Sequence, residues 1–323
     1  MRRRLGEIEL GEIPRRYVVH WVERDVEITG RIDDPLWECA AWSADFVDIL
    51  GSEAPRPRYR TRMKMVWGEA GLAIAAELEE PHVWGTLTER DSVIFQDNDF
   101  EVFIDPDGDG HLYGEIEINA LNTVWDLLLV KPYRAGGPAI DAWDIKGLRS
   151  AVYVDGTLND PLDEDCRWSV EILLPWPSIM EIAGRKGMPA PGDHWRINFS
   201  RVEWQHEVVD GCYQKRPDTP EDNWVWSPQG VVDMHRPHRW GYVSFAKEGV
   251  GERFEPPAET AILEDLYEAQ REFRAEHGRW AVSVDELGRV PMPELRIETT
   301  GAFLEMTLGS WHIDHDSRLW CGA

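Results

Sequence analysis

The sequence predicts an all-β protein, an antiparallel β-sandwich of jelly-roll or immunoglobulin-like type with a small α+β extension at its C-terminus. Many short runs that alternate or concentrate β-formers are separated by Gly, Pro and Asp turn signals, and no long helical pattern occurs before residue 250. Gly68 and Gly71 indicate a hairpin turn between two of these runs. The expected strands cover Tyr17–Ile28, Tyr59–Trp67, Leu72–Leu78, Phe100–Asp105, Glu115–Asn119, Thr123–Lys131, Ala151–Asp155, Cys166–Leu174, His194–Glu203 and Gly241–Phe245.

The last quarter of the chain has a different character. Gly249–Pro257 is typical of a linker, and Ala258–His277 follows with apolar residues at helical spacing and Gly278 at the C-cap position. Leu295–Leu308 and Trp311–Trp320 predict a terminal hairpin. We therefore expect a sandwich domain over 17–248 and a helix–hairpin extension over 258–323, docked on the sandwich because it is too small for a core of its own.

Composition excludes several classes of function. A net charge of −26 over 323 residues argues against nucleic acid and anionic membranes as partners. No apolar run is long enough for membrane insertion or for the core of a signal peptide, which predicts a cytoplasmic protein unless the true start lies upstream. The 4 Cys are widely spaced and indicate no zinc, redox or disulfide motif. The 17 Trp exceed what packing needs, so some of them could stack on sugar rings.

The segment Asp99–Asn119 is the most informative in the chain. It contains two alternating runs joined by an acidic, Gly-rich turn. Phe100, Val102 and Ile104 would face a core, while Glu101 would face water or a binding groove together with the acidic positions of the second run. A carboxylate at such a place can bind a ligand's polar groups.

Four stretches together resemble the family 9 carbohydrate-binding modules, in particular the family-9-like proteins of bacteria. The resemblance extends from about Val18 to Lys247 and rests on the order and spacing of the stretches. They are Ile32–Trp37; Asp97–Asp109 with Tyr113–Asn119 and Trp125-Asp126; Trp168–Trp176; and Arg196–Arg201 followed by Trp224–Pro228, His235 and Trp240–Tyr242.

The resemblance implies a β-sandwich that holds a mono-, oligo- or polysaccharide between two aromatic rings and requires no cofactor. By position, Phe95 and Trp226 are the implied stacking rings, although the family pattern has Trp where this chain has Phe95. The other implied contacts, all polar or adjoining, are Asn98, Glu101, Arg134, Asn223 and Trp224. The 218–230 loop predicts Trp224 and Trp226 on one face if it is extended.

The turn Asp105-x-Asp-x-Asp-Gly110 imitates the start of a calcium-binding loop. An EF-hand needs a carboxylate at position twelve, where this chain has Ile116, and its flanks indicate strands, so we exclude an EF-hand. A structural Ca²⁺ held by Asp105, Asp107 and Asp109 stays possible beside the alternative of a metal-free hairpin turn, and the resemblance favours calcium.

Three functions remain open from the sequence. The first is non-catalytic carbohydrate binding in support of polysaccharide catabolism. The second is a structural or assembly protein whose sugar pocket has degenerated. The third is a hydrolase of O-glycosyl bonds, for which acids such as Glu101, Glu115, Glu117 and Glu171 are available but chance alone would supply pairs. The sugar and the oligomeric state are not predicted.

Overall fold

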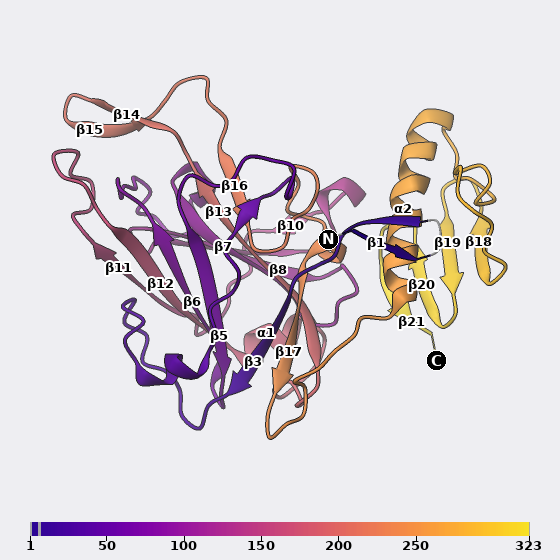
Figure 1. Ribbon diagram of the computed structural model, residues 1–323, viewed down its shortest axis with the longest axis horizontal. Coiled ribbons are helices and arrows are strands. Elements are labelled where there is room, and N and C mark those ends of the chain that lie inside the picture. The colour runs from indigo at the N-terminus through magenta and orange to yellow at the C-terminus, as the bar shows by residue number, and fades with distance from the viewer. Residues whose placement is uncertain (1, 6–7, 323) are drawn as a thin grey trace.

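Most of the chain folds into one large β-sheet that curls over on itself (Figure 1). The computed structural model describes residues 2–5 and 8–322. The strand order is β10-β9-β8-β7-β13-β17-β3-β5-β6-β12-β11, with β16 on β13 and β4 on β16. Its strands are β3 (Arg16–Trp21), β4 (Val47–Asp48), β5 (Thr61–Trp67), β6 (Gly71–Glu79), β7 (Asp99–Asp105), β8 (Tyr113–Asn119), β9 (Val124–Leu129), β10 (Ala139–Ile140), β11 (Arg149–Asp155), β12 (Arg167–Pro175), β13 (His194–Glu203), β16 (Asp222–Val225) and β17 (Gly241–Ala246).

The predicted β-sandwich is confirmed, with one difference in strand direction. The pairs β17–β3 and β3–β5 are parallel, whereas the other pairs of this sheet are antiparallel, so the sheet is mixed. The smaller elements are the strand pairs β1 (Arg2–Leu5) with β2 (Ile8–Glu12) and β14 (His206–Val209) with β15 (Cys212–Lys215), helix α1 (Trp176–Ile182), and the 3₁₀ turns Pro35–Cys39, Ile94–Gln96, Tyr133–Ala135 and Pro237–Arg239.

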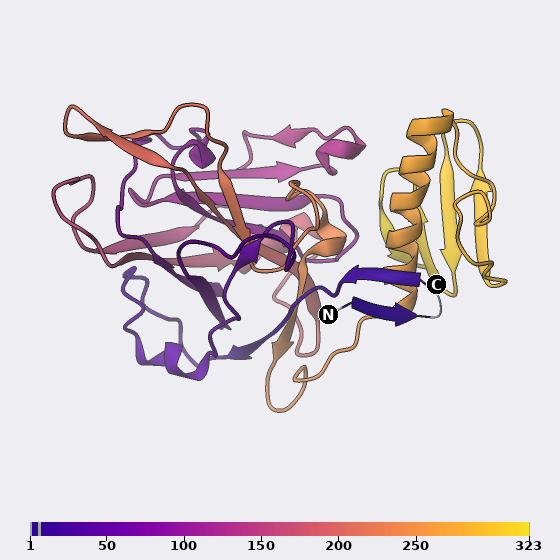
Figure 2. The ribbon, with the colours of Figure 1, turned by 45° about the horizontal axis from the view of Figure 1, so that its top comes forward.

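The main core lies between the two halves of the curled sheet (Figure 2). Alternate residues of β7, namely Phe100, Val102 and Ile104, are buried there with side chains of β8 and β13. The strands β5, β6 and β12 supply the other wall, with Met65 and Ile74 among its fully buried side chains. Period-two alternation therefore builds the core as predicted, and it sends the other residues of β7 to the opposite face of the sheet.

The first stretch of the family resemblance has a structural explanation. Asp34 begins the 3₁₀ turn, and its side chain accepts a hydrogen bond from the backbone N–H of Leu36 at 2.9 Å. This turn buries Trp37, whose indole Nε1 donates to Glu171 Oε1 at 2.5 Å. Glu171 also accepts from the backbone N–H of Gly30 at 2.6 Å. The buried carboxylate of Glu171 on β12 thus accepts hydrogen bonds at both oxygens. These bonds hold the N-terminal segment against the sheet.

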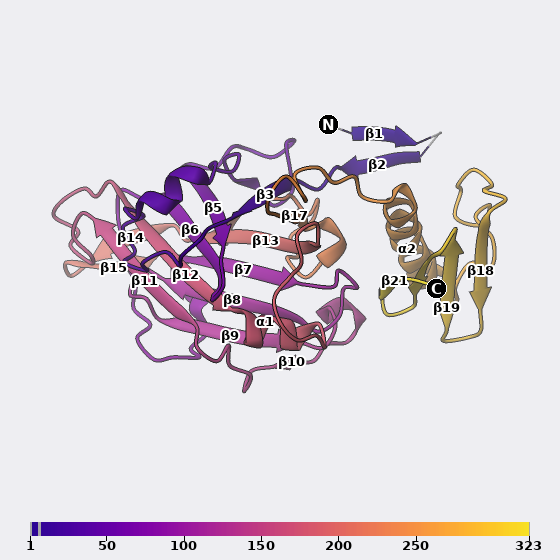
Figure 3. The ribbon, with the colours of Figure 1, turned by 90° about the horizontal axis from the view of Figure 1, so that it is seen from below.

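The C-terminal extension is larger than the predicted hairpin. Helix α2 (Ala258–His277) ends at Gly278, which has a φ of 72° as the C-cap prediction requires. Four antiparallel strands follow and pack against the helix, which lies between them and the main sheet (Figure 3). Its side toward the sandwich carries ion pairs, for example Glu264 with Arg196 at 3.0 Å. The strands are β18 (Leu295–Thr299), β19 (Leu304–Leu308), β20 (Trp311–Asp314) and β21 (Leu319–Cys321).

Within the described part of the chain, no helix has the length and apolar character needed to cross a bilayer. Cys39, Cys166, Cys212 and Cys321 are all exposed and unbridged.

The burial of Trp226 against Gly241 gives a direct stability test. A Cβ at Gly241 would lie 2.1 Å from the indole of Trp226, a ring that is only 1% exposed. We expect Gly241→Ala to reduce the free energy of unfolding by about 1–3 kcal/mol, because the packed ring has nowhere to move. Gly301→Ala is the control, since its Cβ would meet no atom within 4 Å. Urea unfolding measures the free energy of unfolding of both variants. A value for Gly241→Ala equal to that of the wild type would show that the ring of Trp226 can leave the core.

Candidate functional site

A cavity of about 290 Å³ opens on the face of β7, β8 and β9 that points away from the main core. We call it the carboxylate cavity. Its walls come from strands β7, β8, β9, β13 and β16 and from the loops beside them, so segments far apart in the sequence meet here. Its lining residues are Ile49, Phe95, Glu101, Phe103, Glu115, Glu117, Trp125, Tyr133, Val202, Glu221, Asn223, Val232, Asp233, Met234 and His235.

Strand register places acids opposite one another on this face. Glu101 on β7 pairs with Glu117 on β8, and Phe103 pairs with Glu115. We expected this face to meet water or a groove, but every residue of β7 and β8 is buried. Glu101 is 5% exposed and Glu117 is 2% exposed. The alternation was therefore predicted correctly, and the loops that cover this face turned it into a cavity.

The buried acids shift one another's ionisation. Burial first, and then the charge of neighbouring acids, raises the pKa of Asp99, Glu115 and Glu117 well above the usual range. Burial also raises the pKa of Glu101 to about 7, and the nearby hydroxyl of Ser200 opposes part of this rise. No Lys or Arg is among the residues that line the cavity. The cluster of acids without a lining cation therefore favours the binding of a positively charged group.

Hydrogen bonds from the protein satisfy only part of this group. Glu117 Oε2 accepts from the backbone N–H of Phe95 at 2.8 Å, and Asp99 Oδ1 accepts from that of Val202 at 3.2 Å. The second oxygen of Asp99, Oδ2, is buried and has no hydrogen-bond partner. Such an atom is unusual in a folded protein and indicates a place where something else binds.

Aromatic rings form one wall of the cavity. Phe95 and Trp125 lie nearly parallel, with ring centroids 6.4 Å apart and an interplanar angle of 29°. The indole Nε1 of Trp125 donates to Asp141 Oδ1 at 2.6 Å, which fixes the ring plane. Tyr133, which also lines the cavity, is 51% exposed. Its ring is edge-on to that of His235, with the ring centroids 4.5 Å apart. Burial lowers the pKa of His235 to about 4, so this imidazole is neutral at ordinary pH.

The structure brings together three of the residues implied by the sequence resemblance. Phe95, Glu101 and Asn223 all line the carboxylate cavity although more than 120 positions separate the first from the last. Their contact with a sugar stays a prediction. Trp125 and Tyr133 were missed as site residues. The sequence shows only that Trp125 follows the acidic strand, whereas its register with Glu117 is visible in the structure alone.

The predicted roles of the two loop tryptophans are wrong. Trp226 lies in the main core, edge-on to Tyr17 at 6.5 Å and to Phe199 at 5.9 Å, and cannot reach a ligand. Trp224 is 2% exposed, and the guanidinium of Arg201 lies 5.1 Å from its ring. The segment is extended, as assumed, but it is strand β16 and the short run after it, so both rings face the core.

Two of the residues predicted as polar contacts do not line the carboxylate cavity. Asn98 is 3% exposed and does not line the cavity, since its Oδ1 accepts from the backbone N–H of Trp204 at 2.8 Å. Arg134 pairs with Glu268 of α2 at 2.5 Å, which commits it to the contact between the sandwich and the extension.

The acidic turn after β7 is internally satisfied to a large extent. Asp105 accepts from the backbone N–H groups of Gly108 at 3.0 Å and Gly110 at 2.9 Å. Asp109 pairs with Arg318 at 2.9 Å. One carboxylate oxygen from each of Asp105, Asp107 and Asp109 lies within 4.8 Å of the others, so the group could hold an ion. The structural calcium stays a prediction.

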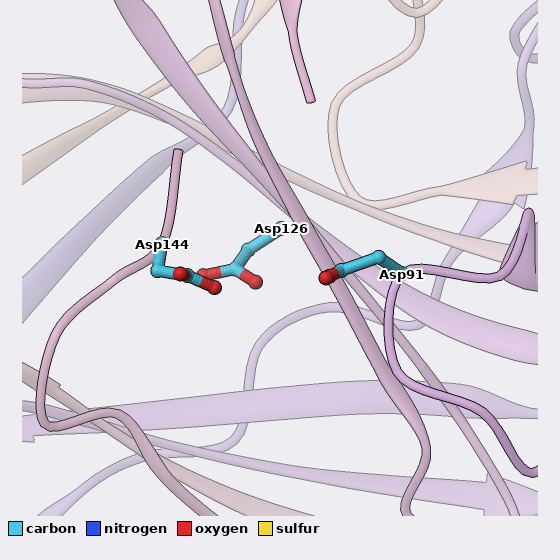
Figure 4. A group of neighbouring side chains, drawn as sticks. All are labelled: Asp91, Asp126 and Asp144. Carbon is cyan, nitrogen blue, oxygen red and sulfur yellow. The ribbon is translucent and has the colours of Figure 1, made fainter. Parts of the chain in front are cut away.

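A third acidic group carries its own counter-charge. Asp91, Asp126 and Asp144 approach one another beside β9 (Figure 4). The guanidinium of Arg90 pairs with Asp126 and with Asp144, the latter at 3.0 Å. Asp126 further accepts from the backbone N–H of Ile145 at 2.6 Å. This group therefore needs no ligand to explain it.

Comparison with known proteins finds no matching family model and no matching curated protein. A family 9 carbohydrate-binding module from Caldicellulosiruptor kristjanssonii, solved with cellotriose, is 14% identical and gives a TM-score of 0.48 over 75% of this chain and 100% of that chain. Its glucose complex gives 0.47. A Bacteroides uniformis ATCC 8492 protein, for which carbohydrate binding has been proposed, is 15% identical and gives 0.51 over 72% of this chain and 99% of that chain.

The chain shares the fold of the Bacteroides protein. This similarity in fold extends over 72% of the chain. At 15% identity the similarity establishes the fold, so the ligand has to be argued from the cavity.

The raised pKa of Glu101 predicts how stability depends on pH. A carboxyl whose pKa rises to about 7 on folding stabilises the protein fully below its unfolded value near 4.5, and this contribution is lost as the pH rises through about 7. Asp99, Glu115 and Glu117 face it and act in the same direction, whereas His235 acts in the opposite one. In the presence of a chelator, the free energy of unfolding of the wild type should fall as the pH rises from about 5 to about 8.5. We expect this fall to be smaller by roughly 1–3 kcal/mol in Glu101→Gln.

Urea unfolding of both proteins across this pH range measures the difference. Glu276→Gln, on the exposed side of α2, is the control and should keep the wild-type slope. Identical slopes for wild type and Glu101→Gln would contradict a shared, desolvated acid cluster.

Proposed function

We propose that the carboxylate cavity binds a saccharide without cleaving it. The observation that carries this proposal is the near-parallel pair of Phe95 and Trp125 on a cavity that carboxylates and the amide of Asn223 also line. A sugar ring has C–H groups on its faces and hydroxyls on its rim, so it needs aromatic planes and hydrogen-bond acceptors in one place.

The dimensions of the cavity favour one sugar ring over a bound chain. Its volume of about 290 Å³ is at the lower end of ordinary ligand sites, which span roughly 300–1,000 Å³. Tyr133 is the exposed ring and would contact the next residue of an oligosaccharide. Recognition of a terminal sugar, or of a free monosaccharide, is what this shape supports.

The polar groups suit hydroxyl recognition. Glu101, Glu115 and Glu117 offer carboxyl oxygens to hydroxyl donors, and the amide of Asn223 both donates and accepts. Phe95 stands where the family pattern has Trp, and its ring is smaller. The large ring of Trp125 lies beside it and compensates for the smaller stacking area of Phe95.

The fold supports the same proposal, because the similar Bacteroides protein is one for which carbohydrate binding has been proposed. Glycoside hydrolysis usually needs one protonated and one ionised carboxyl group, with environments that separate their pKa values. Here the pKa of each cavity glutamate on β7 and β8 moves upward. We therefore favour a binding role that serves polysaccharide catabolism by holding the substrate, and we expect no hydrolysis.

Ring-removal variants test the proposal. Trp125→Ala should weaken saccharide binding at least tenfold, because stacking and burial of the ring contribute about 1–2 kcal/mol or more. Phe95→Ala should weaken it less, since the ring is smaller. A glycan array finds the ligand, calorimetry measures the dissociation constant, and reducing-sugar release tests for hydrolysis.

Trp320→Ala is the matched control. Its ring stacks on His312 in the C-terminal sheet, 5.1 Å away, and should not affect binding. Wild type that binds no saccharide but self-associates tightly would instead support the assembly function. Unchanged binding in Trp125→Ala would show that the sugar binds elsewhere.

A further inference from the structure

Three carboxylates converge beside the carboxylate cavity: Glu101 and Glu117 line it, and Asp99 is fully buried next to them. Asp99, Glu101 and Glu117 each offer one oxygen, and these oxygens lie within 4.8 Å of one another. Ligand oxygens about 2.1–2.5 Å from one metal ion can be at most about 4.2–5.0 Å apart, on opposite sides of it. The spacing therefore fits a single coordination shell, and all three side chains are at least nine-tenths buried.

The unpartnered oxygen of Asp99 is an independent sign of a missing ligand. Asp99 is 0% exposed, one of its oxygens accepts from Val202, and Oδ2 has no partner. A desolvated carboxylate with an unpartnered oxygen and no counter-charge is destabilising. The lining of the cavity contains no Lys or Arg to compensate it.

The chain's other acidic groups show what a compensated cluster requires. Asp126 and Asp144 share Arg90, and Asp109 has Arg318. The Asp99–Glu101–Glu117 group is more deeply buried than either and has no equivalent cation among its lining residues. A positive charge from outside the chain would complete it.

We propose that Asp99, Glu101 and Glu117 bind one divalent cation beside the carboxylate cavity, on the side that Glu101 and Glu117 line. Three carboxylate oxygens form a hard ligand set, which selects Ca²⁺, Mg²⁺ or Mn²⁺ over softer metals. An ammonium group would supply a single positive charge to the three acids. A divalent ion supplies two and therefore neutralises more of their negative charge. Glu115, another acid that lines the cavity, lies in register with Phe103 on the same face and adds to the attraction.

The ion would also shape saccharide recognition. Carboxylates occupy only part of a shell of six to eight oxygens, so positions toward the open cavity remain for water or for sugar hydroxyls. This consequence rests on the proposed function, whereas ion binding itself does not need a saccharide. The two can therefore fail separately.

Calorimetry on the full chain, freed of metal by a chelator, tests the site with CaCl₂, MgCl₂ and MnCl₂ in turn. We expect one ion per cavity, and at least tenfold weaker binding in Glu101→Gln and Glu117→Gln. Circular dichroism checks that each variant is folded. Asp144→Asn is the matched control, because Arg90 already pairs with Asp144, and it should bind like wild type.

Asp107→Asn separates this site from the acidic turn. Ion binding that is lost in Asp107→Asn but intact in Glu101→Gln would overturn the proposal, as would wild type that binds none of the three ions at millimolar concentration. Glucosamine that binds while divalent ions do not would assign the cavity to an ammonium group. Glucose or cellotriose binding that is unaffected by chelator, without ion binding, would overturn this inference but keep the proposed function. Ion binding without any saccharide binding would do the reverse.

Discussion

The pairing of β7 with β8 places carboxylate opposite carboxylate in the interior of a sheet. Glu101 faces Glu117 across this pair, and β13 on the other side of β7 prevents either strand from moving away. A shift by one residue would relieve the repulsion only by turning Phe100, Val102 and Ile104 out of the core. The apolar face thus fixes the register, and the register fixes the acid cluster, although like charges at paired positions destabilise a sheet.

Other buried acids of the described residues have hydrogen-bond donors or a guanidinium as partners, so the acids of the carboxylate cavity differ from them. Glu171 receives the indole of Trp37 and two backbone donors around Gly30. The guanidinium of Arg201 binds both Glu80 and Glu203 at 2.7–2.8 Å. Against these examples, an acid cluster without a lining cation indicates that the compensating charge comes from a ligand.

The sequence predicted the β-sandwich class and most of its strands because alternation is a local signal. The strand pattern of β7 and β8 predicted both the core and the acidic face, and Gly278 correctly marked the end of α2. The parallel pairs of β3 were not predictable, since strand direction depends on contacts distant in sequence.

The site was predicted only in part, for the same physical reason. Glu101 was found because a local pattern marks it, whereas Phe95 and Asn223 came from the resemblance. Trp226 was misassigned because two Trp among turn residues look identical whether they cap a core or face a ligand, and only Gly241 shows that space was made for the ring. Trp125 was missed since its role depends on cross-strand register with Glu117.

Anomalous diffraction from crystals grown with Mn²⁺ near neutral pH tests the central claim most directly. Our account predicts one peak within about 2.6 Å of carboxylate oxygens from Asp99, Glu101 and Glu117, with open coordination positions toward Trp125. The contradicting result is a cavity without an anomalous peak, in which these carboxyl groups are hydrogen-bonded to one another and to water alone.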